Sequence, residues 1–122
     1  MATVRYLVRS VDAAVTFYTA HLGFELERRM GPPFAIVKRG DLRLWISGPE
    51  SSAARPMPDG RRPEPGGWNR LVIEVADLQA TVQQLKQSGV IFRNEIVSGP
   101  GGKQILLEDP SGNPIELFQP AT

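Results

Sequence analysis

The chain has 122 residues, of which 41% are hydrophobic and 22% are charged, and its formal net charge at neutral pH is +1. This length predicts one compact domain, and the balanced charge predicts no affinity for nucleic acid or for an anionic membrane surface. No cysteine is present, which excludes disulfides, thiolate metal ligands and cysteine nucleophiles.

The first half of the chain predicts a strand, a helix and three further strands. Residues 3–11 alternate between an apolar face and a face that carries two arginines, as a half-buried strand does. Residues 12–24 place apolar side chains at helical spacing, with Ser10 or Asp12 as the candidate N-cap and a glycine as the stop. Short strands are then expected at residues 24–30, 34–40 and 41–47.

Residues 48–67 are rich in proline and glycine and poor in apolar residues. This composition is typical of a linker or surface loop, and it lacks the period of a helix or a strand. The segment is longer than most connections, so we expect either a crossover between two halves or a flap over a site. Trp68 follows directly and is expected to anchor the loop onto the body of the protein.

The second half repeats the pattern of the first. We expect a strand at residues 69–75, an amphipathic helix at 76–90, and strands at 91–97, 103–109 and 114–120. Asp77 follows Asp12, and Gly89 follows Gly23, at nearly the same distance along the chain. This near-constant offset indicates an internal duplication. The predicted fold class is therefore α+β, with two tandem β-α-β-β-β modules at residues 1–47 and 68–122, joined by the linker.

Two stretches give the chain a family resemblance. They are "VDAAVTFYTAHLGF" at residues 11–24 and "LEDPSGNPIELFQ" at residues 107–119. In this order, and with the duplicated pattern around them, they resemble the vicinal oxygen chelate superfamily, which contains glyoxalase I, extradiol dioxygenases and bleomycin-resistance proteins. The resemblance implies that the modules pack as an open eight-stranded cup that holds a ligand. It also implies a homodimer.

The same resemblance implies where a metal ion would be bound in metal-using relatives. Their ligands lie in the first and last strands of each module, and these positions fall here on Arg5, Arg70, Glu116 and Leu44, with Arg43 or Trp45 replacing Leu44 if one turn differs in length. A guanidinium stays protonated and has no lone pair to donate. The chain also has a single histidine, His21, for which we expect a structural role. We therefore expect no metal and no resident cofactor, with the arginines supplying the positive charge.

Glu116 interrupts an otherwise apolar strand, and three roles are open for it. The three roles are that of a structural partner for Arg70, that of an acceptor that orients a ligand, and that of a general base. The predicted ligand-binding residues share the polar faces of the strands, where arginine suits planar oxyanions and aromatic rings suit flat ligands. They are Arg5, Arg9, Trp45, Arg70, Glu74, Glu116 and Phe118. No catalytic residue is predicted.

The function expected from these residues is metal-free binding of a planar or anionic small molecule, as in bleomycin-resistance proteins. The alternative is a metal-dependent lyase, isomerase or dioxygenase of the glyoxalase and dioxygenase type, and a third option is a metal-free enzyme that uses Glu116 as its base. The first residues lack the pattern of a signal sequence, so we expect a cytoplasmic protein.

Overall fold

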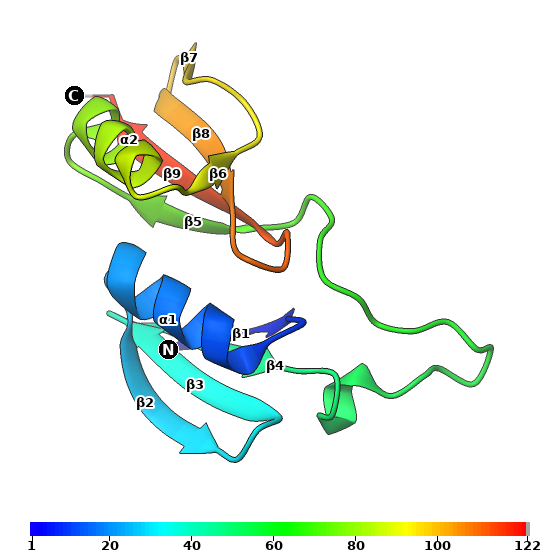
Figure 1. Cartoon of the computed structure of the whole chain (residues 1–122). Coiled ribbons are helices and arrows are strands. Elements are labelled where there is room, and N and C mark those ends of the chain that lie inside the picture. Colours follow the sequence, from blue (N-terminus) through cyan, green and yellow to red (C-terminus); the bar gives the residue numbers. More distant parts are fainter. Residues whose placement is uncertain (122) are drawn as a thin grey trace. The chain divides into compact units, whose positions relative to one another are not determined.

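The computed structural model describes residues 1–121 and divides into two compact units, Met1–Gly66 and Gly67–Thr122. In each unit a helix covers one face of a sheet (Figure 1); the order is β-α-β-β-β in the first unit and β-α-β-β-β-β in the second. The units are described separately below.

The first unit is a four-stranded sheet in the order β1-β4-β3-β2, with β1 parallel to β4 and the other neighbours antiparallel. Its elements are β1 (Ala2–Leu7), α1 (Val11–His21), β2 (Glu25–Met30), β3 (Phe34–Arg39) and β4 (Leu42–Ser47). The core lies between α1 and the sheet, and its fully buried residues include Tyr18, Val37, Leu44 and Ile46. Within the first unit, α1 is the one α-helix, so the opposite face of its sheet is not covered by a helix of this unit.

The first strand is shorter than the alternation predicts, because the chain turns into α1 sooner. β1 ends at Leu7, and Val11 already belongs to the helix. Of the two candidate caps, Ser10 fills the role, since its Oγ accepts a hydrogen bond from the backbone N–H of Ala13. Asp12 instead lies in the first turn and forms an ion pair with Arg29.

The second unit is a five-stranded sheet in which β5 runs parallel to β9, β9 pairs antiparallel with β8, and β6 and β7 both pair with β8. Its elements are β5 (Leu71–Glu74), α2 (Leu78–Gln87), β6 (Ile91–Phe92), β7 (Val97–Gly99), β8 (Gly102–Glu108) and β9 (Pro114–Pro120). Buried residues of α2 and of the sheet form the core of this unit, and Asp77 caps the helix.

The structure has nine strands within residues 1–121, one more than the eight expected. The additional strand arises because the predicted strand at residues 91–97 is interrupted. After Phe92 the backbone of Arg93 still donates to Leu106, but the next ladder position is taken by a side chain: Asn94 Oδ1 accepts the N–H of Leu106 at 2.9 Å. This side-chain bond replaces the backbone pairing and separates β6 from β7.

Residues 48–66, the linker part of the first unit, contain one short 3₁₀ turn, η1 (Ser52–Ala54), and no other regular element. The first of these residues are fastened to the rest of the unit, because Gly48 donates its N–H to the carbonyl oxygen of Pro33 and Ser51 bonds back to the carbonyl oxygen of Gly48. The start of the linker is therefore a fixed wall beside the end of β4.

Candidate functional site

The helix-free face of the first sheet carries two of the predicted residues side by side. Arg5 on β1 is the register partner of Trp45 on β4, and Trp45 is in turn the partner of Ile36 on β3. Side chains alternate across a strand, and Leu44 and Ile46 on either side of Trp45 are buried in the helix-covered core. Arg5 and Trp45 therefore share the open face.

Within the described residues 1–121, the guanidinium of Arg5 is held by neutral groups. Its Nη1 donates to Ser47 Oγ at 3.0 Å, and its Cζ lies 5.0 Å from the centre of the Trp45 ring and 6.0 Å from that of Phe34. The two rings meet edge to face, with centroids 5.7 Å apart. Among residues 1–121, no carboxylate forms an ion pair with Arg5. An oriented guanidinium without a counter-ion attracts an anion.

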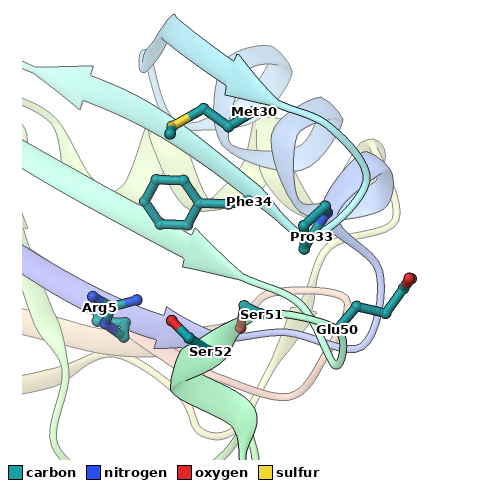
Figure 2. Close-up of a pocket in the computed structure, with 7 residues that line it drawn as sticks. All are labelled: Arg5, Met30, Pro33, Phe34, Glu50, Ser51 and Ser52. Carbon is teal, nitrogen blue, oxygen red and sulfur yellow. The ribbon is translucent and has the colours of Figure 1, made fainter.

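A pocket of about 360 Å³ opens beside this guanidinium, entirely within the first unit. It is lined by Arg5, Met30, Pro33, Phe34, Glu50, Ser51 and Ser52 (Figure 2). The apolar wall comes from β2, the start of β3 and the turn between them, and the polar wall comes from Arg5 and the first residues of the linker. Glu50 lies at the rim, and its carboxylate points away from Arg5 (Figure 2). The pocket thus offers an apolar surface with one positive group.

The second unit carries the other predicted cluster, and its centre is an ion pair. Arg70 donates to the same oxygen of Glu116, Oε1, from Nε at 3.0 Å and from Nη2 at 2.8 Å. The side chain of Glu116 is 10% exposed and that of Arg70 is 28% exposed. This confirms the pairing that the sequence predicts between the two residues. Among residues 1–121, no group donates a hydrogen bond to the second carboxylate oxygen, Oε2.

The remaining predicted residues divide between the two units. Glu74 on β5 is exposed and is the register partner of the half-buried Phe118 on β9, and both lie on the helix-free face that carries Arg70 and Glu116. Arg9 lies beyond the end of β1, in the turn before α1, and it is exposed and does not line the pocket. The structure therefore brings together Arg5 with Trp45, and Arg70 with Glu116, but it does not bring Arg9 to the pocket.

Several contributors were not predicted from the sequence. Phe34 and Met30 form the apolar wall of the pocket, and Ser47 holds Arg5, yet each depends on strand register that no local pattern reveals. In the second unit, Arg93 contacts the ring of Trp68. The alternation of residues along β4 is the signal that could have identified Ser47: Trp45 and Ser47 alternate with the apolar Leu44 and Ile46 and therefore share one face.

The donor set does not fit a metal ion. Within residues 1–121, no group of three or more histidine, aspartate or glutamate side chains lies close enough together to hold one. The position matched to Leu44 also needs correction, because Leu44 is fully buried on the helix side and Trp45 is the residue that faces Arg5. An indole, like a guanidinium, donates no lone pair to a divalent cation. His21 lies at the end of α1, where its ring packs against Phe17.

The chain belongs to the glyoxalase/bleomycin resistance protein/dioxygenase superfamily, whose family model matches residues 1–117. No curated protein matches it. No helix within residues 1–121 has the length and hydrophobicity needed to cross a membrane.

Solved structures show the same fold. A lactoylglutathione lyase from Agrobacterium tumefaciens is 18% identical, with a TM-score of 0.75 over 98% of this chain and 92% of its own. A superfamily member from Sphaerobacter thermophilus DSM 20745 is 24% identical, with a TM-score of 0.76; the match covers 98% of this chain and 95% of the other. TnmS3, an antibiotic binding protein from Streptomyces sp. CB03234, is 26% identical, with a TM-score of 0.72; the match covers 98% of this chain and 93% of the other.

Proposed function

We propose that this protein binds a small planar compound with an anionic group and that it does so without a metal ion. The observation that carries the proposal is the guanidinium of Arg5. It is oriented by Ser47 and by the rings of Trp45 and Phe34, it has no carboxylate partner among residues 1–121, and it borders a pocket whose other walls are largely apolar.

The chemistry of the pocket supports this ligand class. A carboxylate can bind the guanidinium in two-point fashion, because only one nitrogen, Nη1, is engaged by Ser47. The rest of the ligand would lie on Phe34 and Met30, which favour a flat apolar body. A volume of about 360 Å³ is near the lower end of the range for small-molecule sites, so a ligand of one or two rings fits it.

The antibiotic-binding relative supports binding as the function. TnmS3 is similar over nearly the whole chain. From this similarity we propose that the ligand of the present protein is an antibiotic. The likeness to a lactoylglutathione lyase shows the fold alone at its level of identity, and no cluster of metal donors within residues 1–121 favours lyase or dioxygenase chemistry.

Family membership also supports a homodimer, which sedimentation equilibrium would test: a monomeric mass at micromolar concentration would exclude it.

The proposal is tested with two probes that have the same rings and differ in charge, 2-naphthoate and 2-naphthamide. Calorimetry on the wild-type chain should give tighter binding of the naphthoate. Arg5→Gln should weaken naphthoate binding roughly 10- to 100-fold, as expected for loss of a hydrogen bond between charged groups, and should leave naphthamide binding nearly unchanged.

The matched control is Arg62→Gln. Arg62 is an exposed linker residue, and its substitution changes the net charge by the same amount. If naphthoate affinity falls equally in both variants, the change in net charge causes the loss, and not the removal of a contact with Arg5. Equal binding of the two probes by the wild-type chain would refute the proposal.

A further inference from the structure

Trp68 is an unusually exposed tryptophan in a fixed position. It follows two glycines, Gly66 and Gly67, whose backbones have φ of +112° and +90°, and 68% of the surface of the residue is accessible. The carbonyl oxygens on both sides of it are held, since Gly67 accepts from Arg93 Nη1 at 2.8 Å and Trp68 itself accepts from Arg70 Nη1 at 3.3 Å. The residue is therefore exposed without being loosely attached.

One face of the indole rests on Arg93. The guanidinium carbon lies 4.8 Å from the ring centroid, and the Arg93 side chain is only 17% exposed. All three of its nitrogens are engaged: Nε with Glu108 Oε2 at 2.7 Å, Nη1 with Gly67 and Nη2 with the carbonyl oxygen of Gly112 at 2.9 Å. A guanidinium fixed in this way cannot follow the ring if the ring moves, so the stack holds the indole in one orientation. Arg93 covers one face, and because 68% of the surface of residue Trp68 is accessible, the other face of the indole is open to solvent.

The charges around this ring are balanced. Arg93 is paired with Glu108, and Arg70, which holds the Trp68 backbone, is paired with Glu116. The neighbourhood therefore lacks the uncompensated positive charge that Arg5 has in the first unit. A cation on one face of an indole also draws electron density from the ring, which makes the open face a poor partner for a second cation. An uncharged aromatic ring stacked with an offset suits this face best.

We infer that Trp68, backed by Arg93, is a stacking site for a flat, uncharged aromatic group. Trp68 would be the binding residue, and Arg93 would be the positioning residue that keeps the indole presented. The site lies wholly in the second unit, and its assignment does not depend on Arg5. The competing explanation is that Trp68 only shields the Arg93–Glu108 pair from water, and this structural role would require no ligand.

The test uses the indole N–H signals of the ¹⁵N-labelled chain. The chain has two tryptophans, so two indole cross-peaks are expected, and the variants Trp45→Phe and Trp68→Phe assign them. Titration with 2-naphthamide should shift the Trp68 peak saturably, with the upfield ring-current shift of a stacked aromatic, in both the wild-type chain and Arg5→Gln. Trp68→Leu, which keeps apolar bulk, should weaken the naphthamide affinity measured from backbone shifts roughly 3- to 10-fold.

Charge selectivity separates this inference from the proposed function. At the Trp68 peak, 2-naphthoate should bind no more tightly than 2-naphthamide, and 2-naphthylmethylammonium should bind several-fold more weakly. A Trp68 peak that does not move, or that moves linearly up to the solubility limit, would overturn the inference and support the shielding role. Loss of the naphthamide shift in Arg5→Gln, or a clear preference for the anion at Trp68, would also overturn it, whereas failure of the Arg5 proposal alone would leave these results unchanged.

Discussion

Replacing Arg70 with alanine should destabilise the protein because it leaves the carboxylate of Glu116 without its partner. The pair has two hydrogen bonds to one oxygen, and Glu116 is 10% exposed. Breaking a fully buried pair costs about 3–5 kcal/mol, because the remaining charge is desolvated and uncompensated. Arg70 is 28% exposed, so water enters the space that it vacates and reduces the penalty. We expect the free energy of unfolding to fall by about 2 kcal/mol.

Urea denaturation with linear extrapolation measures this change, and the chain contains a matched control. Arg61 forms an ion pair of similar length, 2.7 Å, with Asp59, but both side chains are largely exposed. Arg61→Ala should therefore cost less than about 0.5 kcal/mol. If Arg70→Ala is no more destabilising than Arg61→Ala, water already solvates Glu116 and the reasoning is wrong.

A double substitution tests the cause. Changing Arg70 to methionine and Glu116 to leucine removes the charge together with its partner, so that no ion remains desolvated. This variant should recover more than half of the stability that Arg70→Ala loses. A double variant as unstable as the single one would mean that lost packing, rather than the unpaired charge, sets the cost.

Three further outcomes follow from the structure. Asp77→Ala removes the side-chain acceptor at the N-terminus of α2 and should cost about 1 kcal/mol in urea denaturation, whereas Asp77→Asn, which keeps an acceptor, should cost less than half of that. Gly102→Ala should cost about 2 kcal/mol, because φ is +147° and an added Cβ would overlap the carbonyl oxygen of Gln119. Gly101→Ala should be nearly neutral by the same assay, because the atom nearest to its added Cβ is 4.0 Å away. Addition of zinc, nickel, manganese or ferrous ions should raise the thermal midpoint by less than about 1 °C, because residues 1–121 contain no cluster of metal donors. A saturable increase with any of these ions would contradict that reasoning.

Alternation within strands predicted which side chains share a face. Arg70 directly precedes β5, and Glu116 lies on β9, the parallel neighbour of β5, so their pairing follows from the order of elements in one module. The sequence narrowed the N-cap of α1 to Ser10 or Asp12, and Ser10 fills the role. It did not predict the N-cap of α2, Asp77, which was noted only for its offset from Asp12.

Register between strands was not readable, and the pocket depends on it. Phe34 reaches the ring of Trp45 because of the antiparallel pairing of β3 with β4, and β2 is shifted relative to β3 by an irregularity between Leu26 and Arg28. The mismatch of Leu44 with Trp45 is the same kind of error, since a turn that differs by one residue exchanges the two faces of a strand. The break in the strand at residues 91–97 had a different cause, the competition of the Asn94 side chain for a ladder N–H.

Arg5 and Arg70, the two arginines at positions where the family resemblance implies metal ligands, differ in their acceptors, and this difference supports different roles for them. Arg70 donates to a carboxylate, so its charge is cancelled and the pair contributes mainly to stability. Arg5 donates to the hydroxyl of Ser47, which orients the guanidinium and leaves its charge intact. A hydroxyl and a carboxylate are both good acceptors for a guanidinium, but only the hydroxyl preserves its attraction for an external anion. The hydrogen-bond partners therefore support the proposal of anion binding at Arg5, whereas the charge of Arg70 is paired with that of Glu116, as the sequence predicted for this pair.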